Sequence, residues 1–142
     1  MYELKRRVRF YETDGMRVVY HGNYLNWMEE ARVEYLRTAH ITLDDWMNMG
    51  IVFPIVEAHV KYVQSARYDD DVTVRTWLIH ADRAKMVFRY HIVRDATGEL
   101  LVKAETTGTF TRMDNGRIAR VPKEQIAPLL AMSAEDRDTY HE

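Results

Sequence analysis

The pattern of apolar and polar positions is strongest between residues 23 and 39. Apolar side chains recur there three and four positions apart, at Tyr24, Trp27, Met28, Ala31, Tyr35 and Ala39. This spacing is typical of a helix that buries one face. Asn23 is a good N-cap, because its side-chain oxygen can accept hydrogen bonds from backbone N–H groups one turn later. We therefore predict one long, largely enclosed helix that starts at Asn23 and ends near His40.

Alternating apolar and polar positions predict strands in most of the remaining chain. Residues 2–10 alternate loosely, and residues 51–63 change to a period of two. Pro54 lacks a backbone donor, so this second strand is either an edge strand or bulged at that point. Longer strands are predicted at residues 71–80, 85–94 and 99–112. Because the links between these strands are short, they should form an antiparallel meander.

Shorter elements complete the pattern. Thr42 is suited to cap a short helix that ends at Gly50. Residues 117–121 are predicted to form a short strand. Residues 122–130 are predicted to form a closing helix, because a proline stands near its first turn.

These elements specify an α+β fold in one domain. We expect a five- to six-stranded antiparallel sheet wrapped around a single long helix, over residues 1–132. The polar residues 133–142 are expected to form a frayed C-terminal tail. Such a sheet leaves a long edge strand open, and proteins rarely leave such an edge unpaired. We therefore expect the chain to form a homodimer.

Composition narrows the function classes. The chain carries a net charge of −2 with a pI near 6.3, which gives no general affinity for nucleic acid or for an anionic membrane. It has no cysteine, so disulfides and thiolate chemistry are excluded. It shows neither the apolar run of a signal peptide nor a run of about 20 apolar residues for membrane insertion. We expect a soluble, cytoplasmic protein.

The turn before the predicted helix holds the strongest candidate chemistry. Asp14 and His21 lie in this polar, glycine-containing segment, which runs from Tyr11 to Gly22. The unpaired N–H groups at a helix start carry the positive end of the helix dipole and stabilise a developing negative charge. A carboxylate on the same loop can be brought beside that helix end. Any active site is therefore expected at this junction.

The residues of this junction match a known motif. The pattern T-D-x-x-x-V-V-Y-H-x-N-Y-L-x-W-x-E-x-A-R-x-E-Y-L spans Thr13 to Leu36 and resembles the signature of hotdog-fold acyl-CoA thioesterases of the 4-hydroxybenzoyl-CoA thioesterase type. The resemblance covers most of the chain in the order of its elements. It implies a cytoplasmic homo-oligomer, a homodimer or tetramer, that hydrolyses acyl-CoA or acyl-carrier-protein thioesters without a metal or an organic cofactor.

The resemblance also implies roles for individual residues. Asp14 and His21 match the catalytic positions, as the carboxylate and as the residue whose backbone N–H polarises the thioester carbonyl. The implied substrate-binding residues are Tyr20, Asn23, Tyr24 and Ser65, with Arg83 and Lys85 against the nucleotide phosphates of CoA. Arg17 departs from the pattern, because the family has glycine at this position. If the position needs a positive φ, the loop is expected to be rebuilt around Gly15.

The residues themselves leave several alternatives open. Asp14 can act as a general base or as a nucleophile that forms a mixed anhydride, and it can also merely cap a turn. The His21 side chain is either an acid–base group or a structural hydrogen-bond partner. Arg83 and Lys85 flank a turn, where basic residues are commonly just solvated. Arg32 lies toward the apolar side of the helix, which favours a buried partner over the substrate.

Two other functions fit the same fold. A hotdog dehydratase that acts on hydroxyacyl thioesters also uses a histidine and a carboxylate. A non-catalytic acyl-CoA-binding module keeps the fold and the phosphate contacts but does not need Asp14. His59, His80 and His91 occur singly on predicted strands, which argues against a metal site. The patterns do not specify the acyl group.

Overall fold

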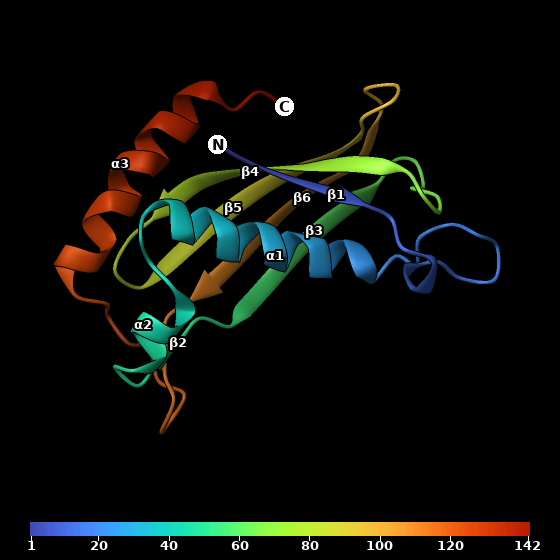
Figure 1. The fold of residues 1–142 in the computed structure, drawn as a ribbon. Coiled ribbons are helices and arrows are strands. Elements are labelled where there is room, and N and C mark those ends of the chain that lie inside the picture. The colour runs from blue at the N-terminus through green and yellow to red at the C-terminus, as the bar shows by residue number, and fades with distance from the viewer.

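The long helix lies in the concave face of a twisted antiparallel sheet in a computed structural model of residues 1–142 (Figure 1). The helices are α1 (Asn23–Thr38), α2 (Leu43–Met47) and α3 (Lys123–Thr139), and a 3₁₀ turn, η1, lies at Phe10–Glu12. The strands are β1 (Tyr2–Arg7), β2 (Ile51–Val52), β3 (Ile55–Tyr62), β4 (Asp71–Ala81), β5 (Lys85–Arg94), β6 (Leu100–Thr109) and β7 (Thr111–Arg112).

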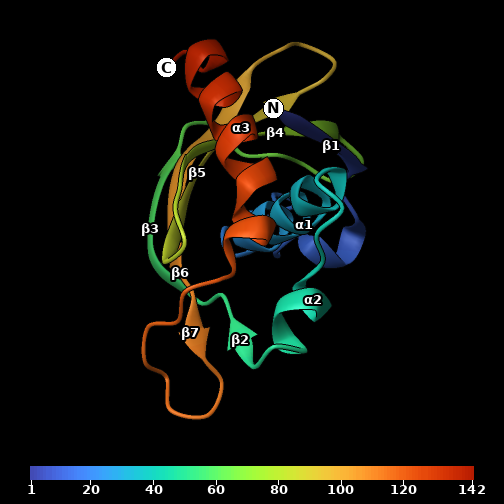
Figure 2. The same ribbon diagram turned by 90° about the vertical axis from the view of Figure 1, so that its left-hand side faces the viewer.

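The five long strands form one sheet in the order β1-β4-β5-β6-β3, and every neighbouring pair is antiparallel. The sheet curves around α1 from β3 on one side to β1 on the other (Figure 2). β2 and β7 pair separately, beyond one end of the main sheet. The predicted α+β fold, a sheet of five to six strands wrapped around one helix, is thus confirmed.

α1 buries the face that its periodicity predicts. Its buried residues are Tyr24, Trp27, Met28, Ala31, Tyr35 and Leu36. Tyr35 meets Phe88 of the sheet edge to face, with ring centroids 5.5 Å apart. Burial of these apolar surfaces supplies the main driving force for docking the helix. Neither α1 nor any other helix is long and apolar enough to cross a membrane.

The start of α1 differs from the prediction. Gly22 occupies the N-cap position, and Asn23 is the first helical residue. The side-chain amide of Asn23 donates to the Glu12 carbonyl at 2.8 Å, and no side-chain capping bond forms. A contact to the preceding loop has therefore replaced the local cap that the N-cap preference of asparagine predicts.

Pro54 divides the predicted strand 51–63 in two. The first part is the two-residue β2, and the second is β3, an edge strand of the main sheet. The pairing of β3 with β6 shifts register between Ile55 and Glu57, which is a bulge next to the proline. An edge position and a bulge were the two alternatives expected of Pro54, and the structure shows both.

The C-terminal segment is more ordered than predicted. α3 continues to residue 139 instead of ending near residue 130. The Asp136 carboxylate is buried there, and it accepts from the Tyr35 hydroxyl at 2.5 Å and from the Leu78 N–H at 2.8 Å. These contacts hold the end of α3 against β4 and α1. The frayed tail expected over residues 133–142 is therefore wrong for most of its length.

Of two short predicted elements, the structure contains the helix capped by Thr42 but not the strand over residues 117–121. Thr42 caps α2 as expected, since its hydroxyl accepts a backbone N–H in the first turn of the helix. Residues 117–121 form no strand, and only Ile118 makes an isolated bridge to β7. The reason is that Val121 turns toward Arg83, and the two residues exchange hydrogen bonds instead of extending a ladder.

Candidate active site

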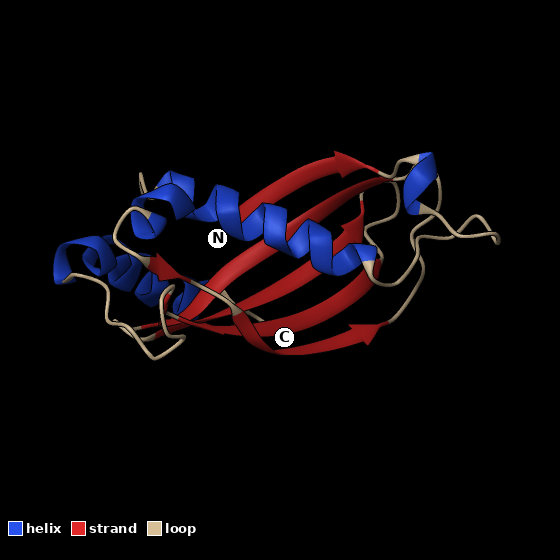
Figure 3. Cartoon of the chain, turned by 90° about the horizontal axis from the view of Figure 1, so that it is seen from below, coloured by secondary structure: helices blue, strands red, loops and turns tan.

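The loop between β1 and α1 forms a small hairpin that projects past the start of the helix (Figure 3). Thr13 and Val19 form a bridge in it, and the Asp14 N–H donates to the Val18 carbonyl at 2.9 Å. The Val19 N–H donates to the Ala66 carbonyl at 2.9 Å. This bond ties the hairpin to the segment between β3 and β4.

Glu12 anchors the base of the hairpin. Its carboxylate is 4% exposed and accepts from Arg6 Nη1 at 2.7 and 2.9 Å, from Trp27 Nε1 at 2.7 Å and from the Arg9 N–H at 2.8 Å. Burial by itself raises the pKa of Glu12, but these donors outweigh burial and hold the pKa below its usual value. The ionised carboxylate therefore joins β1, the loop and α1.

Glu12 is not among the residues predicted from the sequence. Arg6 carries the signal for it, because Arg6 falls on the same side of β1 as Leu4, and an inward-facing arginine needs an acid partner. The Glu12 carbonyl also accepts from the Asn23 side chain at 2.8 Å and from the Tyr20 N–H at 2.9 Å. One residue thus positions both ends of the hairpin.

The start of α1 offers free backbone donors. The N–H groups of His21 and Gly22 make no hydrogen bond, whereas the Asn23 N–H donates to the Tyr20 carbonyl at 2.9 Å. Free N–H groups at a helix start carry positive partial charge and are available to an acceptor. A Cβ on Gly22 would lie 2.7 Å from the Tyr20 ring, so glycine lets this ring rest against the turn. The turn is therefore suited to bind an oxyanion.

Aromatic side chains surround these donors. The rings of Tyr20 and Tyr62 flank the His21 ring, with centroids 4.5 and 6.0 Å from it. Tyr24 is buried, its hydroxyl accepts from the Ala66 N–H at 3.0 Å, and burial raises its pKa. The predicted binding residues at the helix start thus lie together. Tyr62, from the end of β3, was not predicted.

The Asp14 side chain is exposed in the single chain. One carboxylate oxygen accepts from the Met16 N–H at 2.8 Å, and the other makes no hydrogen bond. Arg17 adopts a φ of +66°, whereas Gly15 is not in the positive-φ region. The hairpin therefore keeps the left-handed position at residue 17 with an arginine. The expected rebuilding around Gly15 is wrong.

Ser65 lies near the helix start, as its predicted role requires. It is exposed, and it directly precedes Ala66, which contacts both the hairpin and α1. The Ser65 carbonyl accepts from Arg94 Nη2 at 2.8 Å. Arg94 also pairs with Asp70 at 3.0 Å and with Glu99 at 2.9 Å. These contacts give Arg94 a structural role beside the site.

Arg83 and Lys85 lie at the other end of the sheet. β5 runs for ten residues, about 30 Å, from Lys85 to Arg94, and the helix start adjoins the Arg94 end. Arg83 Nε donates to the Val121 carbonyl at 2.8 Å. Within one chain, the two basic residues are therefore remote from Asp14.

Known proteins share this sequence and this fold. The sequence model of the thioesterase-like superfamily matches residues 8–129. The chain belongs to this superfamily. The acyl-CoA thioesterase YbgC of Haemophilus influenzae is 31% identical over 121 residues, which are 83% of this chain and 86% of that protein.

Solved structures agree with the family assignment. The DHNA-CoA thioesterase of Staphylococcus aureus superposes with a TM-score of 0.85 at 29% identity, over 94% of this chain and 93% of that one. A 4-hydroxybenzoyl-CoA thioesterase mutant in complex with 4-hydroxybenzoyl-CoA superposes with a TM-score of 0.80 at 25% identity, over 89% of this chain and 96% of that one. The predicted membership of the hotdog-fold acyl-CoA thioesterase family is confirmed.

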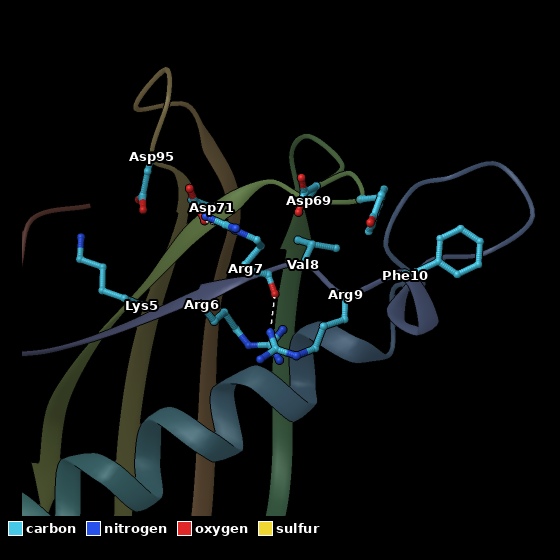
Figure 4. A pocket seen from close by; sticks show the side chains of 10 residues that line it. Lys5, Arg6, Arg7, Val8, Arg9, Phe10, Asp69, Asp71 and Asp95 are labelled. Carbon is cyan, nitrogen blue, oxygen red and sulfur yellow. Dashed lines mark hydrogen bonds and ion pairs between the residues drawn. The ribbon is translucent and has the colours of Figure 1, made fainter.

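A surface groove of this thioesterase-family chain lies along β1 (Figure 4). It has a volume of about 730 Å³ and is lined mainly by the basic segment 5–9 and by Asp69, Asp71 and Asp95. Arg7 pairs with Asp71 at 2.9 Å. Positive and negative side chains thus offset each other in this groove. None of the predicted site residues lines it.

No group of three or more histidine, aspartate or glutamate side chains is arranged to hold a metal ion. His59 pairs with Glu57 and His80 pairs with Asp82, each at 2.7 Å. His91 packs against Trp77 with ring centroids 5.0 Å apart. Local contacts therefore account for all three strand histidines.

Proposed function

We propose that the chain hydrolyses acyl-CoA thioesters to a carboxylic acid and CoA, with Asp14 as the catalytic carboxylate. The observation that carries this proposal is the pair of unbonded N–H groups of His21 and Gly22, at the end of the hairpin that holds Asp14. The names of the relatives support the same reaction, since YbgC and both solved neighbours are named as thioesterases of CoA esters.

The helix start supplies electrostatic stabilisation. Attack on the carbonyl carbon moves negative charge to the carbonyl oxygen, and preorganised donors stabilise that charge. One such donor contributes roughly 3 to 4 kcal/mol in other enzymes. The aligned peptide dipoles of the sixteen-residue α1 act in the same direction. His21 fits this role through its backbone N–H, because its ring packs between Tyr20 and Tyr62 and forms no ion pair with an acid.

Asp14 supplies the attacking or activating group. As a general base, it takes a proton from water while the water oxygen bonds to the carbonyl carbon. As a nucleophile, its own oxygen bonds to that carbon, and water then hydrolyses the mixed anhydride. In both routes the C–S bond breaks, and CoA leaves as a thiolate that takes up a proton. The Met16 N–H binds only one oxygen of Asp14, which leaves the other available for either route.

A second copy of the chain would complete the site. β3 is an edge strand, and most of its side chains are exposed. Such an edge favours pairing with another strand. Two β3 strands that pair antiparallel about His59 would set Glu57 of one copy opposite Lys61 of the other, because each lies two residues from His59. Opposite charges at facing positions stabilise a strand pair.

This pairing also bears on the CoA phosphates. β3 begins at the end of the sheet that holds Lys85, since Ile55 pairs with Gly108 and Lys85 with the next residue of β6. β3 ends at Tyr62, beside the helix start. Antiparallel pairing therefore brings the partner subunit's Arg83 and the partner subunit's Lys85 toward the helix start of the first copy. The predicted phosphate contact is thus proposed for the dimer.

Release of free thiol from short, long and aromatic acyl-CoA esters tests the proposal. We expect at least one class to release CoA and free acid in equal amounts. A chain that binds acyl-CoA but releases no thiol from any ester is a binding module, and this result refutes hydrolysis. Loss of water from a hydroxyacyl-CoA with the C–S bond intact identifies a dehydratase instead.

A further inference from the structure

Arg32 of α1 is a partly buried cation that lies outside the site described above. Arg32 Nη1 donates to the Tyr90 hydroxyl at 3.1 Å, which confirms the predicted buried partner. A guanidinium carries five N–H donors, and this contact uses one of them. Arg32 forms no ion pair and no other hydrogen bond within the chain. Four of its donors are therefore unsatisfied by the protein.

The Tyr90 contact orients Arg32 from inside the core. Tyr90 and Thr106 are both buried, and their hydroxyl oxygens lie 2.6 Å apart. Because the Tyr90 oxygen accepts from Arg32, its own hydrogen is free to bind Thr106. The chain of three side chains therefore holds the guanidinium in place without satisfying it.

Arg32 lines a cavity of about 50 Å³ between α1, α2 and the sheet. The other lining residues are apolar except for Glu29, and they are Val33, Leu36, Leu43, Phe53, Met86 and Phe88. Arg32 is only partly buried, and none of its nitrogens is a buried atom without a partner, so water can reach its remaining donors. A ligand oxygen in the cavity would take the place of that water. The volume admits only a few non-hydrogen atoms. The cavity therefore fits the end of a ligand that carries an oxygen acceptor.

The negative charge of Glu29 bears on whether a carboxylate or a neutral hydroxyl would bind beside Arg32. It is exposed, lies one turn before Arg32 and forms no ion pair. A ligand carboxylate would be attracted by Arg32 but repelled by Glu29. A neutral hydroxyl accepts from Arg32 and can also donate to Glu29. The pair of side chains therefore favours a neutral hydroxyl.

The cavity lies within reach of an acyl group held at the helix start. Arg32 is about 14 Å along the axis from Asn23, and helical side chains lean back toward the helix start. We infer that the cavity receives the distal end of the acyl group, and that Arg32 is a specificity-determining residue for acyl groups that end in a neutral hydroxyl. This inference rests on the proposed hydrolysis of acyl-CoA.

The test compares two acyl-CoA esters of equal chain length, one plain and one with a terminal hydroxyl. In Arg32→Met, kcat/KM for the hydroxylated ester falls by about 10- to 100-fold, as expected when a hydrogen bond from a charged donor is lost. kcat/KM for the plain ester falls much less, because that ester makes no hydrogen bond with Arg32. Arg37→Met is the matched control, because Arg37 is exposed on the same helix, pairs with Glu34 and does not line the cavity.

Glu29→Gln provides a second measurement at an exposed position, where the substitution leaves the core intact. Without this negative charge, kcat/KM for an ester with a terminal carboxylate rises by about fivefold. The plain ester again serves as the internal reference. No change for the carboxylate ester contradicts the inference even if Arg32→Met fails to fold.

The outcomes separate this inference from the proposed function. If the wild type releases thiol from no ester, hydrolysis is refuted and the inference falls with it. If the wild type is active but Arg32→Met lowers kcat/KM for both esters equally, hydrolysis stands and the inference is overturned. That second result is also the one expected if Arg32 pairs with an acid of another copy of the chain.

Discussion

Trp27 donates its indole N–H to the Glu12 carboxylate at 2.7 Å, across fifteen positions of the chain. Arg6 binds the same carboxylate and places its guanidinium 4.6 Å from the centre of the Trp27 ring. The hairpin that carries Asp14 is thus attached to α1 by buried contacts. The geometry of the proposed active site therefore depends on a glutamate that has no assigned contact with the substrate.

Replacing Glu12 with glutamine keeps the size of the side chain but removes its charge. Arg6 is 10% exposed and then retains only the exposed Glu30, at 3.5 Å, as an acid partner. We expect the free energy of unfolding, measured by urea denaturation, to fall by about 3 kcal/mol. Glu3→Gln is the control, because its exposed pair with Arg75 predicts a change below about 1 kcal/mol. Equal losses would show that burial of the pair does not matter.

The same carboxylate makes stability depend on pH. Burial alone raises the pKa of Glu12. The hydrogen bonds from the Arg9 N–H, Trp27 and Arg6 lower the pKa by more than burial raises it, so the folded pKa lies below its ordinary value of 4.5. Such a group contributes stability above the unfolded pKa, and this contribution is lost as pH falls through the folded pKa. The difference in unfolding temperature between wild type and Glu12→Gln should therefore be full at neutral pH and shrink below 4.5. A difference that stays constant into acid would contradict the assignment.

Asp14→Asn removes the proposed base or nucleophile but preserves the turn, because the amide oxygen can still accept from the Met16 N–H. We expect kcat to fall by about 10²- to 10⁴-fold. The circular dichroism spectrum and the unfolding temperature should stay the same. Asp44→Asn, at an exposed position in the first turn of α2, is the control and should keep its activity. Retention of most thiol release by Asp14→Asn would exclude a catalytic role for this residue.

Gly108 of β6 lies directly against Phe53. A Cβ at this position would lie 2.3 Å from two carbons of the Phe53 ring. The ring has little room to move, because its centroid lies 6.2 Å from Trp46 and 4.9 Å from Phe110. Gly108→Ala should therefore lower the free energy of unfolding by about 1 to 3 kcal/mol. Gly15→Ala meets no atom within 4 Å and should leave it unchanged.

The main elements of the fold could be predicted because their signals are local. The helical repeat of residues such as Trp27 and Tyr35 describes the face that α1 buries. Pro54 indicated a strand that is either at an edge or bulged, and β3 is both. The end of α3 could not be predicted in this way. Asp136 is held by Tyr35 and Leu78, which lie 101 and 58 positions away in the chain. A local pattern carries no information about such partners.

For the candidate site, too, only the features that depend on neighbouring residues could be predicted from the sequence. The motif predicts that Asp14 and His21 lie on one loop before a helix. In the structure, both residues lie on the loop that leads into α1. The true contacts of Asn23 depend on Glu12, whose donors come from a strand and a helix that meet only after folding. The distance of Arg83 from the helix start depends on which end of the sheet adjoins the start of α1, and the motif carries no information about that.

β3 leaves a row of backbone donors and acceptors without a neighbour along eight residues. Exposed strand edges of this kind promote association with other chains, so a substitution that prevents the proposed β3–β3 pairing would favour aggregation. The charges of Glu57 and Lys61 discourage stacking out of register and so restrain polymerisation. In the proposed dimer, correct pairing of β3 would therefore protect the chain from aggregation as well as complete the site.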